Sequence, residues 1–536
     1  MRPILKNKLY LYLTEFFAGM SVMAVELGAS RLLAPYFSSS QIVWTIIIGT
    51  IMIAMALGNL YGGRAADRDP NPDRLYRRIT AAAVWIALIP VLGKYIILGI
   101  SAVLVFSVNS NFLIWAAFAA CMVIFVFPLF LLGTVTPSLA KYTMENLEDN
   151  ARIVGTLGAA NTIGSIIGTF VPTFVTIPAV GTAVTFLIFA GILLALALVY
   201  FFSGKGGKKA GAILALVLYL GSCVLGHSGS FAFWKGDLTY EGESIYNYLQ
   251  VSEDERSVVL STNVLFGVQS ILRKDESLTG MYYDYAMAAP LMADAVGKQE
   301  RGEALELLVL GMGTGTYGSQ CSRYFPSMAV EGVEIDGKIT QLAREYFAMP
   351  AEVPVATYDG RAYLNAIDKR YDVIMVDAYQ DITIPFQMAS VEFFTLVREH
   401  LKDGGVMVVN MNMRGQQEGN INQYLADTIS AVFSQVYTAD VAYNTNRELF
   451  ASNDPRMLET MEENLARLSD PALRAMLEQV SQRLQPYEAG LYRMTDDRAP
   501  VELLSMQVID ELIQDEVSYY KGIYERQGLQ GLIDSF

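Results

Sequence analysis

The sequence predicts a multi-span α-helical membrane domain, followed by an α/β domain with a doubly wound parallel sheet and a small β-rich part before it. Long apolar runs fill residues 9–230, whereas residues 236–536 have the charge density of a soluble protein. From Leu305 onward, apolar strands, glycine turns and helical segments alternate, which is typical of a parallel sheet. The two halves of the chain are therefore suited to different solvents.

The composition argues against several classes of function. The net charge is −15 and the chain has no basic tail, which counts against nucleic acid as a partner and fits a small cationic ligand. The three cysteines and two histidines give no metal-binding spacing and no disulfide framework. We therefore expect no metal site and no Ser/His/Asp triad.

The first half contains seven candidate membrane spans, each close to the roughly 20 apolar residues that a bilayer requires. They are residues 10–33, 41–62, 78–105, 111–136, 152–177, 179–202 and 210–229. The pairs Gly58/Gly62 and Gly164/Gly168 place small residues four apart, which predicts close helix packing. We expect a multi-pass protein of the cell membrane, with the lipid bilayer as a partner.

Two questions about this half stay open. Glu26 and Arg31 lie in or near the first span, where they form either an internal ion pair or part of a polar pathway. Basic loops place the soluble half outside the cytoplasm if there are seven spans, whereas the supply of a cofactor favours the cytoplasm. The side of the soluble half is therefore left unassigned.

A glycine loop opens the predicted sheet. In "LELLVLGMGTGTYG" a strand runs into Gly311, Gly313 and Gly315, and the next strand, "MAVEGVEID", ends at Glu334. Glycines let the backbone pass close under a ligand, and an acid about 20 residues on can accept hydrogen bonds from ribose. This pattern indicates a nucleoside-bearing cofactor.

Further acids follow later strands of the sheet. Asp359-Gly360 closes "VATYDG", and "YDVIMVDAYQD" ends in Asp377 and Asp381. Strand ends of a parallel sheet share one edge, so we expect these acids to lie beside the glycine loop. Two carboxylates over a nucleoside pocket can hold an ammonium group and accept its proton. In "LKDGGVMVVNMN" we expect a helix to end at Gly404-Gly405 and a strand to follow.

The chain contains the motifs "ELGASRLLAPYFSSSQIVW", "GAANTIGSIIGTF", "EIDGKI", "DGRAYL", "VDAYQDITIP" and "TDDRAPVE". Together these motifs resemble the spermidine synthase (polyamine aminopropyltransferase) family, and above all its membrane-fused members. The resemblance implies transfer of an aminopropyl group from decarboxylated S-adenosylmethionine to a diamine such as putrescine, without a metal. The products would be a spermidine-type polyamine and methylthioadenosine.

The resemblance also implies an organisation of the chain. Residues 1–235 form the transmembrane domain, and 236–300 the small β-rich part. Residues 301–452 form a Rossmann-like domain of the S-adenosylmethionine-dependent transferase type, and 453–536 a C-terminal helical extension.

The roles that the resemblance implies for single residues fall into three sets. Asp377 accepts the proton of the attacking amine. The cofactor is bound by Gln269, Gly311, Gly313, Thr314, Gly315, Glu334, Asp359 and Gly360. The amine substrate is bound by Tyr282, Tyr283, Asp284, Tyr379, Asp381 and Pro385.

Two positions depart from the family pattern. Thr314 stands where the glycine loop of the family carries an aspartate, and Tyr283 stands where the family has a histidine. Thr314 cannot pair with an ammonium group as a carboxylate does, so intact S-adenosylmethionine stays an alternative cofactor. Two other functions remain open: a methyltransferase acting on a membrane-associated or exported substrate, and a non-catalytic polyamine transporter or sensor. The membrane half would serve as anchor, entry path or transporter, and a homo-oligomer is possible.

Overall fold

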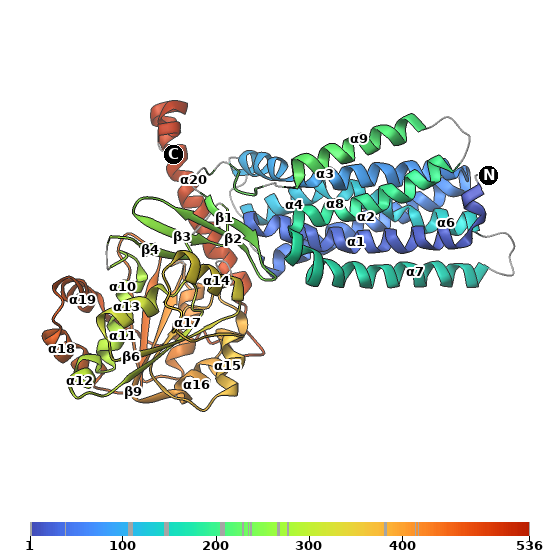
Figure 1. Cartoon of the computed structure of the whole chain (residues 1–536). Coiled ribbons are helices and arrows are strands. Elements are labelled where there is room, and N and C mark those ends of the chain that lie inside the picture. The colour runs from blue at the N-terminus through green and yellow to red at the C-terminus, as the bar shows by residue number, and fades with distance from the viewer. Residues whose placement is uncertain are drawn as a thin grey trace. The chain divides into compact units, whose positions relative to one another are not determined.

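A computed structural model of the chain describes residues 3–37, 39–105, 111–143, 150–203, 209–227, 230–233, 235, 238–264, 268–275, 278–379, 383–412, 414–415 and 417–534. Contacts divide the chain into two compact units. One unit holds Met1–Gly236, Glu241–Tyr248 and Asn263–Leu265, and the other holds the remaining residues. Figure 1 shows the helices of the first unit and the sheets of the second.

The first unit is built from helices that pack side by side (Figure 1). After a short 3-10 helix, η1 (Pro3–Lys6), they are α1 (Lys8–Phe37), α2 (Gln41–Arg68), α3 (Pro72–Val105), α4 (Phe112–Ile124), α5 (Val126–Gly133), α6 (Val135–Thr143), α7 (Asn150–Val171), α8 (Ile177–Phe202) and α9 (Lys209–Gly226). Within the described residues, five helices are long and apolar enough to cross a membrane, or six if α4 and the helix that follows it, bent by 49°, form one span. These helices indicate a multi-pass membrane protein.

The predicted spans 152–177 and 179–202 are two arms of one helical segment, Asn150–Phe202. Figure 1 shows α7 and α8, its two arms, as separate rods. Between them the chain passes through a π-helical turn, and Gly181 leaves the helical region with φ 79°. Glu243 accepts hydrogen bonds from the backbone N–H (2.7 Å) and the hydroxyl (2.6 Å) of Thr182, which stabilises the break. Hydropathy therefore predicts two spans in this segment, whereas the structure has one continuous helical segment with a break.

The glycine pairs pack as predicted. A Cβ atom on Gly164 would lie 2.0 Å from the carbonyl oxygen of Phe16, and one on Gly58 would lie 2.3 Å from that of Phe130. Both glycines therefore let two helix backbones touch, α7 on α1 and α2 on α5. The prediction of close packing at these positions is confirmed.

Polar groups also lie inside the helical unit. Glu15 of α1 is fully buried and accepts hydrogen bonds from Thr136 (2.5 Å) and Asn161 (2.8 Å). Arg31 donates to the carbonyl oxygen of Ile245. Glu15 thus bonds neutral groups, and the role of Glu26 and Arg31, as an internal ion pair or as part of a polar pathway, stays a prediction.

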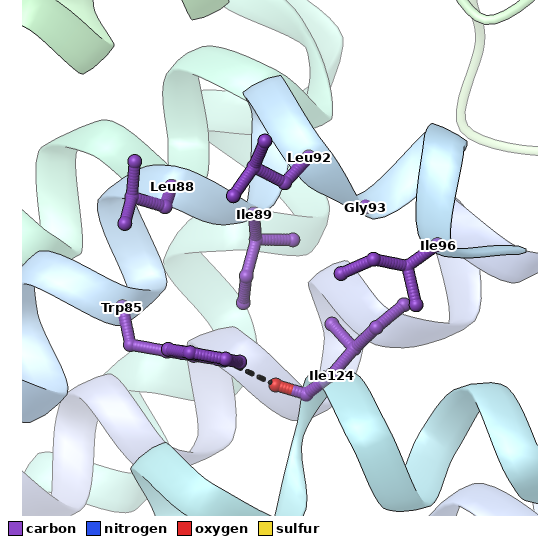
Figure 2. A pocket seen from close by; sticks show the side chains of 7 residues that line it. All are labelled: Trp85, Leu88, Ile89, Leu92, Gly93, Ile96 and Ile124. Carbon is purple, nitrogen blue, oxygen red and sulfur yellow. Dashed lines mark hydrogen bonds between the residues drawn. The ribbon is translucent and has the colours of Figure 1, made fainter.

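A small pocket on α3 is apolar throughout. Figure 2 shows the seven side chains that line it and the hydrogen bond from the Trp85 indole to the carbonyl oxygen of Ile124 (2.8 Å). These residues are Trp85, Leu88, Ile89, Leu92, Gly93, Ile96 and Ile124. Its lining supplies no carboxylate that could pair with an ammonium group.

Two sheets follow the helices. The strands of a four-stranded sheet run in the order β1 (Leu238–Glu243), β2 (Tyr248–Glu253), β3 (Ser257–Ser261) and β4 (Ser270–Arg273), with β2/β3 and β3/β4 antiparallel. Alternate residues of β2 and β3 pack on α14 (Gly337–Tyr346) through Leu249, Val251, Leu260 and Ile339. This is the small β-rich part that the sequence predicts.

The large sheet has the strand order β12-β10-β11-β9-β8-β5-β6-β7. Its strands are β5 (Leu305–Leu310), β6 (Met328–Glu334), β7 (Val355–Thr357), β8 (Tyr371–Val376), β9 (Leu401–Met411), β10 (Gln435–Asp440), β11 (Arg447–Ser452) and β12 (Gln485–Pro486). The strands from β9 to β7 are parallel, whereas β11, β10 and β12 are added antiparallel. The predicted α/β fold class is confirmed.

Helices cover this sheet (Figure 1). They are α10 (Tyr282–Ala286), α11 (Ala288–Met292), α12 (Ala295–Glu300), α13 (Thr316–Tyr324), α14, α15 (Gly360–Ala366), α16 (Val391–Glu399), α17 (Ile421–Ser430), α18 (Met457–Arg467) and α19 (Pro471–Arg483), with a 3-10 turn η4 (Phe386–Met388). The last helix, α20 (Val501–Asp534), packs on α17. Leu305, Leu307 and Val309 pack in the core beneath α10–α13, α18 and α19. Successive strand residues point to opposite faces, so the buried side chains of Leu308 and Leu310 pack on the other face of the sheet. Both faces of the central strands are therefore buried.

One predicted boundary is wrong. The expected helix end at Gly404-Gly405 lies inside β9, because α16 already ends at Glu399. Gly404 has φ 72°, and the pairing of β8 with β9 shifts register between Tyr371 and Val373. The two glycines therefore form an irregularity inside a strand. The prediction failed because a glycine that follows a helical pattern also marks the end of a helix.

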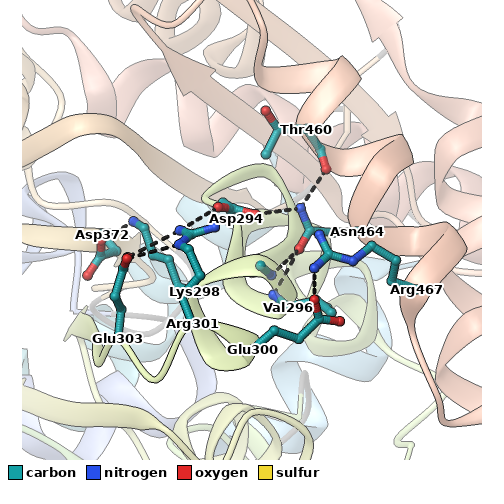
Figure 3. Close-up of polar contacts among 11 residues, drawn as sticks. Asp294, Val296, Lys298, Glu300, Arg301, Glu303, Asp372, Thr460, Asn464 and Arg467 are labelled. Atoms are coloured by element: carbon teal, nitrogen blue, oxygen red, sulfur yellow. Dashed lines mark hydrogen bonds and ion pairs between the residues drawn. The ribbon is translucent and has the colours of Figure 1, made fainter.

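The C-terminal extension is attached to the sheet domain by specific polar contacts. Figure 3 shows Asn464 of α18, whose Oδ1 accepts from the backbone N–H of Val296 (2.8 Å) and Gly297 (3.0 Å) at the start of α12. Its Nδ2 donates to Asp294 (3.1 Å). Arg467 pairs with Glu300 one helix turn away. The extension also supplies β12, so it is not entirely helical.

Candidate active site

The glycine loop after β5 passes under the end of β8. Gly311, Gly313 and Gly315 all have positive φ, at 84°, 54° and 81°. A Cβ atom on Gly311 would lie 2.4 Å from the carbonyl oxygen of Asp377, whose N–H donates to Leu310 (2.9 Å). There is no room for a side chain at Gly311, and the backbone of the loop packs directly against the backbone of Asp377.

Glu334, at the end of β6, is bound to this loop. Its Oε2 accepts from the N–H of Gly313 (2.9 Å), and its Oε1 accepts from the N–H of Asp336 (3.0 Å). Burial raises the pKa of Glu334 to about 7, although these backbone hydrogen bonds act in the opposite direction. A carboxylate oxygen can accept a second hydrogen bond, so Glu334 has acceptor capacity for ribose hydroxyls.

Asp377 has two hydrogen-bond donors. Tyr282 donates to its Oδ2 (2.6 Å) and the side-chain amide of Asn410 donates to its Oδ1 (2.9 Å). Burial raises the pKa of Asp377 to about 7, and both hydrogen bonds partly offset this shift. A carboxylate that titrates near neutral pH suits a general base, because it takes a proton readily and is still largely ionised.

Two adjacent tyrosines of α10, Tyr282 and Tyr283, lie beside Asp377. The rings of Tyr282 and Tyr283 lie 4.0 Å apart between centroids. The Tyr283 hydroxyl donates to the carbonyl oxygen of Gln269 (3.0 Å) and lies 3.5 Å from the hydroxyl of Ser270. Burial, followed by the charge of Asp377, raises the pKa of both tyrosines, so both stay protonated as donors. Gln269 therefore borders the same site through its backbone.

Three predicted side chains are engaged by the protein itself. The Thr314 hydroxyl lies 3.2 Å from that of Thr316, and its residue is 1% exposed. Asp284 accepts four hydrogen bonds, which come from Thr279, Gly280 and Gln320. These contacts hold the loop before α10 and leave Asp284 no open face toward a substrate.

Tyr379, the third, is bound to β9. Its hydroxyl donates to the carbonyl oxygen of Asn410 (2.5 Å) and accepts from the N–H of Asn412 (3.0 Å). This hydroxyl therefore fixes the loop after β8 on β9. The hydroxyl is thus already bonded on both sides, whereas attraction of a cation would use the ring face and not the hydroxyl.

The remaining predicted residues that the structure describes lie at the starts of α15 and η4. Asp359 caps α15 by accepting from the N–H of Ala362 (2.8 Å), and Gly360 begins that helix. Pro385 precedes the turn η4. Asp381 lies outside the described residues.

An ion pair that the sequence analysis did not identify joins these segments. Both terminal nitrogens of Arg361 bond the carboxylate of Asp496 (2.7 and 2.6 Å), which also accepts from Ser390 (2.6 Å). Arg361 follows Gly360, and Ser390 follows the loop of Pro385. The pair therefore fixes the start of α15 against Ser390, the residue before α16.

Two more residues of the site were not predicted. Asn410 binds Asp377, and Glu448 lies directly opposite Asn410 in the β9/β11 register. Glu448 is 0% exposed, and its pKa is raised well above the usual value by burial and by Asp377. An acid in the apolar strand "RELFAS" is a signal that the sequence does contain.

Comparison with known proteins gives a consistent picture. The sequence profile of the spermine/spermidine synthase domain matches residues 286–449. A probable polyamine aminopropyl transferase of Bifidobacterium longum is 51% identical over 354 residues, which cover 63% of this chain and 77% of that protein. A polyamine aminopropyltransferase of Vibrio vulnificus is 24% identical over 264 residues, 48% of this chain and 82% of that one.

Among solved structures, spermidine synthase from Thermotoga maritima aligns over 53% of this chain and 88% of its own. The sequence identity is 17% and the TM-score 0.36.

Proposed function

The chain belongs to the spermine/spermidine synthase family and is a spermidine-synthase-like aminopropyltransferase; from this premise we propose that it transfers the aminopropyl group of decarboxylated S-adenosylmethionine to a diamine such as putrescine. In this reaction the amine nitrogen forms a bond to the carbon of the aminopropyl group that is attached to the sulfonium sulfur. The carbon–sulfur bond breaks, its electron pair stays on sulfur, and methylthioadenosine leaves as a neutral thioether. One proton must leave the nitrogen.

Asp377 carries this proposal as the proton acceptor. It lies at the end of β8 beside the glycine loop, held by Tyr282 and Asn410, and its pKa is near 7. An amine attacks only after losing its proton, so a fixed base at this point accelerates the reaction. The sulfonium needs no acid to leave, and the rest of the rate gain comes from orientation.

The cofactor seat fits a nucleoside. The three glycines leave backbone surface where side chains would project, and Glu334 stands at the next strand end with its carboxylate fixed on the loop. Asp359 and Gly360 begin the helix that follows β7. These groups are the ones we assign to ribose and adenine.

The acceptor site is assigned to the other side of Asp377. Tyr282 and Tyr283 supply aromatic faces and hydroxyl groups there, and Tyr379 and Pro385 border the acidic loop that contains Asp381. A small cationic amine is held by such a combination of aromatic rings and carboxylates.

One observation favours a second function. The centre of the glycine loop carries Thr314, whose hydroxyl lies 3.2 Å from the hydroxyl of Thr316. Without an acid there, nothing in the loop repels the carboxylate of intact S-adenosylmethionine. A methyltransferase is therefore the alternative, with S-adenosylhomocysteine as its product.

A product analysis separates the two functions. Purified full-length protein is incubated with either cofactor and putrescine, and the nucleoside product is identified by mass spectrometry. We expect methylthioadenosine and spermidine from the decarboxylated form, and neither from Asp377→Asn. Turnover of only the intact form to S-adenosylhomocysteine would refute the aminopropyl transfer, and the absence of any product would favour a binding protein.

A further inference from the structure

Glu448 is a fully buried acid. It lies on β11, has 0% of its surface exposed, and neither of its carboxylate oxygens makes a hydrogen bond within the described part of the chain. An unpaired buried carboxyl is strongly unfavourable, because it gives up its hydration and gains nothing in return. Such a group calls for an explanation outside the packing of the fold.

The position of Glu448 connects it to the reacting centre. It stands opposite Asn410 across the β9/β11 ladder, and Asn410 donates to Asp377 (2.9 Å). Directly opposite residues of an antiparallel pair project on the same face. The charge of Asp377 acts on Glu448, and the charge of Glu448 in turn raises the pKa of Tyr283 and Tyr379. Glu448 therefore lies on the same face of the sheet as Asn410, and its charge acts on the proposed base and on the tyrosines beside it.

The substrates bring more positive charge than Asp377 can balance. The diamine carries two amino groups, the aminopropyl group carries a third, and the sulfonium adds a fixed charge. Asp377 is occupied by the attacking amine, and Thr314 gives the glycine loop no carboxylate. A second acid is needed wherever another ammonium group enters this buried space.

We propose that Glu448 forms an ion pair with a primary ammonium group of a bound substrate. This inference rests on the proposed aminopropyl transfer, and it makes Glu448 a substrate-binding residue. The ammonium belongs either to the aminopropyl group of decarboxylated S-adenosylmethionine or to the acceptor diamine, since both have the same charge and hydrogen-bond donors.

The test compares wild type with Glu448→Gln in the full-length protein. Glutamine keeps the shape of the side chain and removes its charge. Calorimetry measures the affinity for decarboxylated S-adenosylmethionine and for methylthioadenosine, which lacks the ammonium group. Steady-state kinetics gives the KM for putrescine. Loss of a charged hydrogen-bonded pair corresponds to about a 10- to 100-fold weakening.

Each outcome has a defined meaning. A weaker affinity for the decarboxylated cofactor, with unchanged affinity for methylthioadenosine, assigns the pair to the aminopropyl ammonium. A raised KM for putrescine alone assigns it to the acceptor. If Glu448→Gln raises the melting temperature of the ligand-free protein and leaves every affinity within about two-fold, the proposal is overturned.

A matched control separates this role from a structural one. Glu331 is bonded to Tyr363, Lys369 and Tyr371, none of which is assigned to the substrates. Glu331→Gln should lower the melting temperature and leave ligand affinities unchanged. If wild type makes no methylthioadenosine, the proposed function fails, but the calorimetric comparison of the two nucleosides still decides whether Glu448 pairs with an ammonium group.

Discussion

The hydroxyl of Tyr282 donates a 2.6 Å hydrogen bond to Oδ2 of Asp377. This bond lowers the pKa of Asp377 against the larger effect of burial. Tyr282→Phe should therefore move the acid limb of kcat/KM to higher pH and lower kcat/KM at pH 7 by about 10- to 100-fold. Methylthioadenosine affinity, measured in parallel, should stay unchanged; an unaltered pH profile would argue against the bond.

The pH dependence of the reaction follows from Asp377 itself. Its pKa is about 7, so the base form increases as the pH rises through 7. We expect kcat/KM to fall about ten-fold for each pH unit below that point, because kcat/KM reports the free enzyme. Glu334 also titrates near 7. Glu334→Gln should weaken cofactor binding and keep an acid limb, whereas a profile that is flat from pH 5 to 8 in wild type would contradict the assignment of Asp377.

A substitution at Gly311 tests whether the glycine loop binds the nucleoside of the cofactor. Alanine there would place its Cβ 2.4 Å from a backbone oxygen of Asp377, and φ 84° adds a strain of about 1–2 kcal/mol. Gly311→Ala should lose nucleoside affinity by more than about ten-fold, as measured by calorimetry. Gly302→Ala is the control, because Gly302 has φ 71° with open space around it. Equal affinity losses in the two variants would assign the effect to backbone strain alone.

The sequence was sufficient for the parts of the site that depend on local pattern. The glycine loop and the acids at the ends of β6 and β8 follow from strand–turn–helix periodicity, and the structure brings Gly311, Glu334 and Asp377 to one edge. The membrane helices followed from composition in the same way. These features each depend on residues close together in the chain.

Other parts depend on contacts between distant residues. Glu448 meets Asn410 through the register of two antiparallel strands, and a shift of one residue would have turned it to the other face. The engagement of Asp284 by Gln320 likewise depends on packing between α10 and α13. Strand register and side-chain direction are therefore what the pattern of a single sequence leaves undetermined.

The close contact of α1 and α7 predicts an asymmetric response to substitution. On α7, Gly164→Ala would force a Cβ to within 2.0 Å of the Phe16 carbonyl oxygen, whereas Gly158→Ala meets nothing within 4 Å. Overpacking of this kind costs about 1–3 kcal/mol. We expect Gly164→Ala to lower the melting temperature in detergent and Gly158→Ala to leave it unchanged or raise it. Equal melting curves would mean that the two helices separate easily.

Asp377 should also lower the stability of the ligand-free protein, by an amount that depends on pH. Its pKa is raised from 3.8 to about 7 by burial, so below pH 3.8 the folded and unfolded chains are both protonated there. As the pH rises toward 7 the unfolded chain ionises first, and stability is lost until the folded carboxyl ionises too. Asp377→Asn removes this dependence. The melting temperature of the variant relative to wild type should therefore increase from pH 5 to pH 8, measured without ligand. A constant difference across this range would show that Asp377 is already ionised at pH 5.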